Sequence, residues 1–163
     1  MRSGRDLVNN AIGSALGLGL SPIAPGSFGA LLGVAYTVAV FLVLPVAGRP
    51  WAIACFLLAV AVANHVLTPW AVAFWKNEDP RHFVLDEVAG YLVVPLLVPQ
   101  GTLWQVAFWG FLAFRVFDII KIPPARQIDR SMHGPWGILL DDLVSGAYAA
   151  LAIYAYRFLA GGS

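Results

Sequence analysis

The segment 114–142, FRVFDIIKIPPARQIDRSMHGPWGILLDD, concentrates acids and bases in a chain that is otherwise almost uncharged. Charge is unfavourable near a bilayer and tends to be kept there for function. Cationic side chains clamp phosphate oxygens, and carboxylates hold a hard divalent cation. The segment is therefore typical of a site for a metal-bound phosphate. Its charged or titratable residues are Arg115, Asp118, Lys121, Arg126, Asp129, Arg130, His133, Asp141 and Asp142.

Two groups in this segment have spacings that suggest a role. Arg115, Asp118 and Lys121 are three residues apart, so on a helix they would share roughly one face. The structural alternative is a salt-bridge ladder at the membrane edge, although exposed ion pairs contribute only about 0–1 kcal/mol. Asp141 and Asp142 are adjacent carboxylates that repel each other unless they are protonated, paired or bridged by a cation. We expect them to open the last membrane helix and to bind a metal.

A second acidic pair, Asp86-Glu87, opens an apolar helix in VLDEVAGYLVV. Acids at a helix start complement the helix dipole, which explains one acid better than two. Gly90 lies one turn after Asp86, and Gly146 lies one turn after Asp142, so another helix could approach closely at either position. We expect Asp86 and Glu87 to be functional rather than only a helix start.

The remaining polar positions leave alternatives open. After Pro123-Pro124, the basic residues fit a phosphate site better than a loop lying on anionic lipid, and His133 is a general acid, a phosphate contact or a structural histidine. The stretch SPIAPGS, residues 21–27, would bind phosphate with backbone N–H groups at a helix start, or would be a membrane-entry turn. The pair Asn64-His65 is either functional or forms an interhelical hydrogen bond.

Composition defines the class of protein. The 163 residues are 60% hydrophobic and 12% charged, against about 25% charged in a typical soluble domain, so we predict an integral membrane protein. The net charge of +1 argues against a nucleic-acid surface. We expect one domain over residues 1–163, an all-α polytopic compact helical bundle with an interfacial N-terminal helix and four to five membrane segments.

The apolar runs locate these elements. Residues 88–113 form either one kinked span or a hairpin that turns at residues 99–101. The hairpin is favoured because it puts residues 76–87 and 115–142 on one side and leaves most Lys and Arg there, as the positive-inside rule prefers. The other expected elements are an interfacial helix at 5–20, membrane spans at 28–46, 51–75 and 143–159, and a polar loop at 76–87.

Four ordered stretches, GLGLSPIAPGSFGALLG, LDEVAG, FRVFDIIKIPPARQIDR and HGPWGILLDDLVSG, resemble the phosphatidylglycerophosphatase A family. These bacterial membrane enzymes remove the terminal phosphate from phosphatidylglycerophosphate. The resemblance covers almost the whole chain, and four motifs in order are far more specific than any one alone. It implies an all-helical fold, Mg²⁺ dependence and a product, phosphatidylglycerol, that feeds cardiolipin synthesis. It also implies a phospholipid substrate in the bacterial inner membrane and an active site on the cytoplasmic face.

The family's functional positions map onto charged residues of this chain. Two departures are Lys121-Ile122-Pro123-Pro124, where the family usually reads Lys-Pro-Trp-Pro, and Gly134-Pro135, where it usually reads Gly-Gly. Neither removes a charged group, and both bear on loop shape. The matched positions are Asp86 and Glu87, then Arg115, Asp118 and Lys121, then Asp129, Arg130, His133 and Gly134, and finally Asp141 and Asp142.

We therefore predict a Mg²⁺-dependent lipid phosphatase. The nucleophile is metal-activated water, which is favoured, or an aspartate, and His133 or an acid protonates the leaving oxygen. The alternative is a transporter or flippase of an anionic lipid or phosphate, which would favour charges nearer the bilayer middle. The oligomeric state stays open. The expected catalytic residues are Asp86, Glu87, Asp118, Asp129, His133, Asp141 and Asp142, all but Asp129 and His133 being metal ligands, and the expected phosphate-binding residues are Arg115, Lys121, Arg126, Arg130, Ser21, Gly26 and Ser27.

Overall fold

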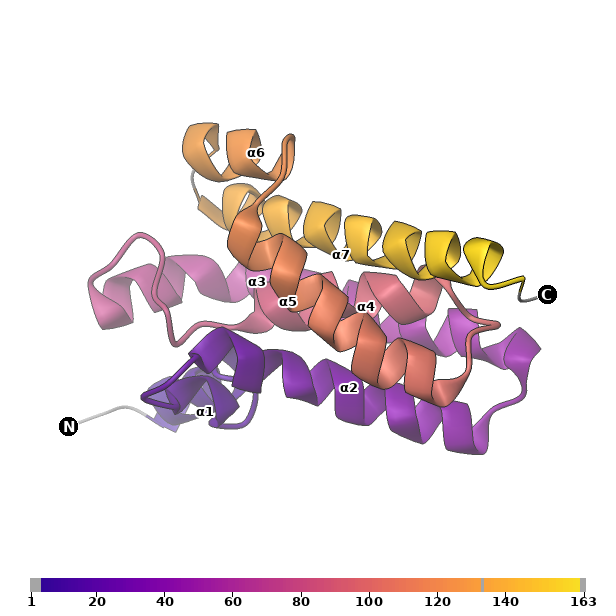
Figure 1. Ribbon diagram of the computed structural model, residues 1–163. Helices are drawn as coiled ribbons and strands as arrows, with labels where there is room; N and C mark the ends of the chain where they lie inside the picture. The colour runs from indigo at the N-terminus through magenta and orange to yellow at the C-terminus, as the bar shows by residue number, and fades with distance from the viewer. Residues whose placement is uncertain (1–3, 133, 162–163) are drawn as a thin grey trace.

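The computed structural model describes residues 4–132 and 134–161, and within these residues the regular structure is helical, without strands. The all-α prediction is confirmed. The long helices lie side by side, with α2 along one side of the bundle and α7 along the opposite side in Figure 1. The α-helices are α1 (Gly4–Gly13), α2 (Pro25–Val43), α3 (Arg49–Trp75), α4 (Leu85–Leu97), α5 (Gly110–Ile120), α6 (Ala125–Ser131) and α7 (Gly134–Leu159). Shorter elements are the 3-10 turns η1 (Leu18–Leu20) and η2 (Val46–Gly48) and the π-helical turn η3 (Gln105–Trp109).

Helix α4 is the centre of the bundle, where it packs against α7, α2 and α3. Its sequence is apolar on every side after the initial acids, which is the pattern of a helix buried all round. Tyr91 and Leu92 are fully buried. Close packing begins at Gly33 of α2, where an added Cβ would lie 2.8 Å from the Tyr91 ring. The central helix therefore holds its first turn in a fixed position relative to α2 and α7.

Residues 88–113 form the hairpin rather than a single kinked span. Helix α4 ends at Leu97, the chain turns at residues 99–101, and η3 and α5 run back along the bundle. The Tyr91 hydroxyl donates to the carbonyl of Val106 at 3.3 Å and links the two arms. The hairpin therefore brings the start of α4 and the end of α5 to the same end of the molecule, as the topology argument required.

Three helical segments are long and apolar enough to cross a bilayer, namely Pro25–Val43, Val46–Trp75 and Gly134–Leu159. This finding indicates membrane association. The arm α4 has 13 residues, about 20 Å of helix, against a hydrocarbon core of about 30 Å. The four to five membrane segments expected from the sequence therefore stay a prediction, with three segments supported by length and composition.

The N-terminal helix is shorter than expected. Helix α1 ends at Gly13, and Ala15, Leu16 and Gly17 then adopt positive φ angles of 50°, 61° and 93°. A residue with positive φ cannot continue a right-handed helix. The Ser14 hydroxyl donates to the carbonyl of Asn10 and accepts from the N–H of Gly17, which stabilises this turn. The helix expected over residues 5–20 is therefore divided into α1 and η1.

The last helix begins earlier than expected. The sequence suggested a span at 143–159 opened by Asp141-Asp142, but α7 starts at Gly134 and already contains both acids. Pro135 lies in the first turn, where the missing N–H of proline leaves no intrahelical partner unsatisfied. The two acids therefore lie in the third turn of α7, and the helix start does not stabilise their charge.

Candidate active site

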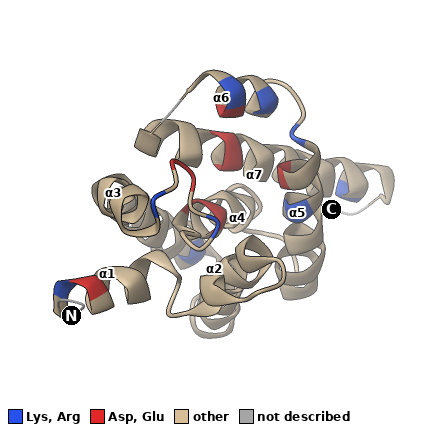
Figure 2. Cartoon of the chain, turned by 90° about the vertical axis from the view of Figure 1, so that its left-hand side faces the viewer, with Lys and Arg blue, Asp and Glu red and all other residues tan. Residues whose placement is uncertain are grey.

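Acids and bases gather at one end of the bundle, which Figure 2 views end-on. A cavity of about 330 Å³ opens there between the starts of α2 and α4, the end of α5, α6 and the first turns of α7. We call it the site cavity. Its charged lining residues are Glu78, Asp79, Arg81, Asp86, Glu87, Asp118, Lys121, Asp129, Asp141 and Asp142, and Gly26 also lines it.

Three carboxylates form a tight group in this cavity. Asp86, Glu87 and Asp142 each offer an oxygen, and these oxygens lie within 4.8 Å of one another. Asp86 Oδ1, Glu87 Oε2 and Asp142 Oδ2 are buried and have no hydrogen-bond partner among the described residues. Buried charges in proteins are normally paired or coordinate a metal. The group therefore fits a hard divalent cation, for which carboxylate oxygens are the preferred ligands.

Two glycines allow the helices that carry these acids to approach each other. A Cβ on Gly90 of α4 would lie 2.7 Å from the backbone oxygen of Asp142 and 2.7 Å from the Phe114 ring. A Cβ on Gly146 of α7 would overlap the backbone oxygen of Gly90. The close approach expected at both glycines is confirmed. It is what places Asp142 beside Asp86 and Glu87.

Burial changes the acidity of the pair on α4. Burial raises the pKa of Asp86 well above its ordinary value, and the nearby carboxylates of Glu87 and Asp142 raise it further. Burial also raises the pKa of Glu87 to about 7. In the metal-free protein this pair therefore retains protons that a bound cation would displace, because a cation favours the ionised form.

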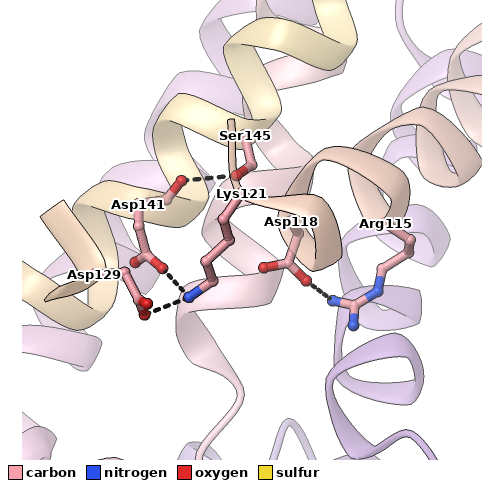
Figure 3. A network of polar contacts seen from close by, with 6 residues as sticks. All are labelled: Arg115, Asp118, Lys121, Asp129, Asp141 and Ser145. Atoms are coloured by element: carbon pink, nitrogen blue, oxygen red, sulfur yellow. Dashed lines mark hydrogen bonds and ion pairs between the residues drawn. The ribbon is translucent and has the colours of Figure 1, made fainter. Parts of the chain in front are cut away.

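Lys121 is held between two acids, as Figure 3 shows. Its Nζ lies 2.5 Å from Asp129 Oδ1 of α6 and 2.6 Å from Asp141 Oδ2 of α7. Lys121 follows α5 with a φ of 49°, and this turn directs the chain toward α6. Although burial lowers the pKa of Lys121, its bonds to Asp129 and Asp141 raise it above the ordinary value. Lys121 therefore stays charged and joins α5, α6 and α7 at the cavity wall.

Arg115 forms the other ion pair of the site. Its Nη1 lies 2.7 Å from Asp118 Oδ2 within α5 (Figure 3), and Asp118 lines the cavity. Across the cavity wall, a Cβ on Gly26 would overlap Glu87 Oε1 and would lie 3.3 Å from Arg115 Nη1. Gly26, Glu87 and Arg115 are therefore in close proximity. The start of α2 has room for this arrangement because residue 26 lacks a side chain.

Other expected site residues lie away from the cavity lining. The Arg126 guanidinium donates to the carbonyl of Ile120 at 3.2 Å, and the Ser21 hydroxyl donates to the carbonyl of Ile23 at 2.8 Å. Arg130 and Ser27 do not line the site cavity among the residues described. His133 lies outside the described residues. The roles of these residues stay predictions.

The loop before α4 contributes three charged lining residues that the sequence reading did not single out, Glu78, Asp79 and Arg81. Phe83 at the end of this loop is buried, and the His82 ring Nδ1 lies 2.9 Å from the carbonyl oxygen of Gly19, so the loop packs onto the bundle beside the site. The signal available in the sequence was the polar run KNEDPRH between two apolar stretches. A polar loop is a common membrane connector, so composition alone did not distinguish its role.

Asn64 contacts the start of α7. Its amide Nδ2 donates to the carbonyl of Pro135 at 3.3 Å, and the neighbouring His65 ring packs on Trp136 with centroids 5.2 Å apart. Of the two readings of Asn64-His65, the structure has the interhelical hydrogen bond. This contact fixes the first turn of α7, two turns before Asp141 and Asp142.

Known proteins similar to this chain are phosphatases by name. Residues 11–157 match the family model for phosphatidylglycerophosphatase A. Phosphatidylglycerophosphatase A of Escherichia coli (strain K12) is 30% identical over 139 residues, which are 85% of this chain and 77% of that protein. The Haemophilus influenzae protein of the same name is 30% identical over 143 residues, 87% of this chain and 84% of that protein.

A protein of Bacteroides thetaiotaomicron named "putative phosphatidylinositol-3-phosphatase" is 32% identical over 154 residues, 92% of this chain and 94% of that protein. No solved structure matches the chain. The family model covers the elements that build the site cavity, from the start of α2 to α7. The chain is a phosphatase and belongs to the phosphatidylglycerophosphatase A family.

Proposed function

We propose that the protein is a Mg²⁺-dependent lipid phosphatase that hydrolyses the terminal phosphomonoester of phosphatidylglycerophosphate to phosphatidylglycerol and phosphate. The observation that carries the proposal is the group of three carboxylates with buried, unpartnered oxygens, next to the cations Arg115 and Lys121. A phosphomonoester dianion needs this combination of a divalent cation and fixed positive charge. The names of the two relatives from Escherichia coli and Haemophilus influenzae supply the substrate.

The carboxylates have distinct proposed roles. Asp86, Glu87 and Asp142 would hold the cation, and Asp118 and Asp141 would act on it through water. When bound, Mg²⁺ supplies charge to neutralise the phosphoryl oxygens and lowers the pKa of a coordinated water. The Lys121 ion pair orients the Asp141 carboxylate, and the Arg115 ion pair orients that of Asp118.

The cations and remaining acids would handle the phosphate and the leaving group. Lys121 and Arg81 line the site cavity and would contact phosphoryl oxygens there. Arg115 lies beside Gly26, outside the cavity lining, and would add positive charge next to Glu87. Hydrolysis breaks the bond between phosphorus and the glycerol oxygen, adds water to phosphorus and requires a proton on that oxygen. As the sequence suggested, His133 or an acid of the site would supply that proton.

We also place the site on the cytoplasmic face of the bacterial inner membrane, with α1 at the interface. Most Lys and Arg residues among those described lie at the site end, as the positive-inside rule favours. Two exceptions lie near the hairpin turn, where Arg49 donates to the carbonyl of Pro99 at 3.4 Å and Arg157 shares a hollow with Gln100. On α1, Leu7 and Val8 are 59% and 57% exposed, which suits a helix lying on the membrane surface.

A second candidate substrate is a phosphatidylinositol phosphate with a 3-phosphomonoester, because one relative carries that activity in its name. Both lipids present a phosphomonoester on a polar headgroup, and the same site chemistry serves either. The transporter alternative loses its support, because the chain belongs to a phosphatase family.

The test is release of inorganic phosphate from each lipid by purified protein in detergent, with Mg²⁺ and then with EDTA. We expect release from phosphatidylglycerophosphate that stops with EDTA and returns with Mg²⁺. Asp142→Asn should abolish turnover and keep the wild-type circular dichroism spectrum, whereas Asp6→Asn, on α1 away from the lining, should remain active. Faster release from the inositol lipid would assign the second substrate. Phosphate release that continues in EDTA would contradict the proposed dependence on a divalent metal.

A further inference from the structure

Helices α5 and α7 run antiparallel and meet along one seam that starts at the site cavity. Lys121 pairs with Asp141 at the end of the seam next to the site cavity, and the rings of Phe117 and Tyr148 lie 5.7 Å apart further along the seam. The next residues on the same faces, Ala113 on α5 and Ala152 on α7, both line a second cavity. The seam therefore connects the candidate active site to this cavity along a continuous line of paired residues.

The second cavity, which we call the seam groove, has a volume of about 320 Å³. It is lined by Gln105, Trp109, Ala113, Ala152, Ile153 and Tyr156. Apolar groups dominate this lining, and the Gln105 amide oxygen already accepts a hydrogen bond from the N–H of Thr102 at 3.1 Å. None of the described residues that line the groove carries a charge, so a charged ligand would find no ionic partner among them. The lining instead suits a hydrocarbon chain.

Side-chain size explains why the groove is open. The groove is lined in its middle by the small side chains of Ala113 and Ala152, which leave the seam open. The large side chains of Trp109 and Tyr156, which are 52% and 62% exposed, also line it. Helix α7 is one of the segments long and apolar enough to cross a bilayer, so a groove on its surface faces the hydrocarbon region. A groove in that region is filled by lipid rather than by water.

The distance between groove and site matches one lipid leaflet. Ile153 follows Asp142 by eleven residues on the same helix, about 16 Å at a rise of about 1.5 Å per residue. Half of a hydrocarbon core of about 30 Å is about 15 Å. A lipid with its headgroup at Asp142 would therefore bring part of an acyl chain to the seam groove.

We propose that the seam groove binds one acyl chain of the lipid substrate, so that the enzyme recognises the hydrocarbon as well as the phosphate. This inference rests on the proposed lipid phosphatase function. The Phe117–Tyr148 ring pair fills the seam between the site cavity and the seam groove. The acyl chain would therefore lie over these rings, along the lipid-facing side of α5 and α7. Burying methylene groups here contributes to substrate binding and leaves the chemical step unchanged.

The first test fills the groove. Ala113→Phe and Ala152→Phe are compared with Ala155→Phe, an exposed alanine of α7 that does not line the groove. We expect the groove variants to raise KM for long-chain phosphatidylglycerophosphate about tenfold, a loss of about 1.4 kcal/mol, with kcat retained. KM for the dihexanoyl analogue, whose short chains bury few methylene groups in the groove, should stay within about twofold of wild type.

The outcomes separate the two proposals. Equal effects on both chain lengths, or no effect on either, would overturn the groove assignment while the phosphatase stands. Absence of phosphate release from either substrate by wild-type protein would instead overturn the function.

A second measurement does not depend on turnover. Substrate brominated near the acyl terminus should quench Trp109 fluorescence in EDTA, and Trp109→Phe should remove that quenching component. Ala113→Phe should reduce it, and Ala155→Phe should not. Equal quenching by brominated phosphatidylcholine at the same concentration would show that bulk lipid fills the groove, which contradicts a substrate-specific site.

Discussion

The contact between Gly90 and Gly146 predicts that one methyl group can inactivate the enzyme. In Gly90→Ala the new Cβ would lie 2.7 Å from the backbone oxygen of Asp142 and 2.9 Å from its Cβ. Favourable separations of such atoms begin near about 3.5 Å. Helices α4 and α7 must therefore separate by about 0.8 Å, directly between Asp86 and Asp142.

This displacement acts on catalysis more than on folding. Overpacking a core usually destabilises a protein by about 1–3 kcal/mol. We expect the variant to stay folded in detergent after a loss of this size. A misplacement of about 1 Å at reacting groups lowers the rate by about 10²-fold. We therefore expect Gly90→Ala to lose about 100-fold in kcat with a modest fall in melting temperature.

The assay is phosphate release together with Mg²⁺ titration, monitored by thermal stabilisation. Gly146→Ala should be at least as severe, because its Cβ meets the Gly90 carbonyl, which cannot rotate away. Gly48→Ala is the matched control, since its Cβ would have no neighbour nearer than 3.8 Å. Full activity and normal Mg²⁺ stabilisation in Gly90→Ala would refute the account of how α4 and α7 build the site.

Three further perturbations test other parts of the molecule. Lys121→Met should lower the free energy of unfolding by about 3 kcal/mol and reduce turnover, because the 6%-exposed Asp141 side chain loses its partner. Thermal melting measures this effect, with Lys76→Met as the control. Equal stability of the two variants would argue against the pairing. EDTA-treated protein should lose stability as pH rises from about 5 to about 8. Burial raises the pKa of Glu87 to about 7, so over this range the folded state holds a proton that the unfolded chain releases. A melting temperature that rises with pH would contradict this. Asn64→Ala should destabilise the protein by about 1–3 kcal/mol relative to Cys55→Ala on the same helix, because the carbonyl of Pro135 loses its hydrogen-bond donor. A melting temperature equal to that of Cys55→Ala would show that Asn64 does not anchor α7.

Much of this architecture was predictable from local patterns. The turn residues Pro99-Gln100-Gly101 and the one-sided distribution of charge predicted the hairpin, and α4 begins at Leu85, directly before the predicted Asp86-Glu87 pair. Each feature depends on short-range chemistry, either a sequence that cannot continue a helix or an apolar run of the right length. The two acidic pairs meet because the glycine one turn beyond each pair allows close packing.

Other features depend on tertiary contacts that no local pattern specifies. Gly134-Pro135 reads as a break in sequence, but Pro135 lies in the first turn of α7, where Asn64 holds its carbonyl. Lys121 was expected to bind phosphate, and its two carboxylate partners follow from how α6 folds onto α7. The loop residue Arg81 lines the cavity because its loop packs down onto the site.

The unpartnered oxygens of Asp86, Glu87 and Asp142 also bear on how this protein evolves. Three adjacent acids with buried oxygens destabilise the metal-free fold, because they must either repel one another or take up protons. Replacing any of them with a neutral residue of similar size would therefore give a more robust but inert protein. Selection for stability alone would therefore remove these residues, and their joint presence indicates continued selection for activity. Stabilising substitutions are better sought at the opposite end of the bundle, around the hairpin turn, where no such conflict exists among the residues described.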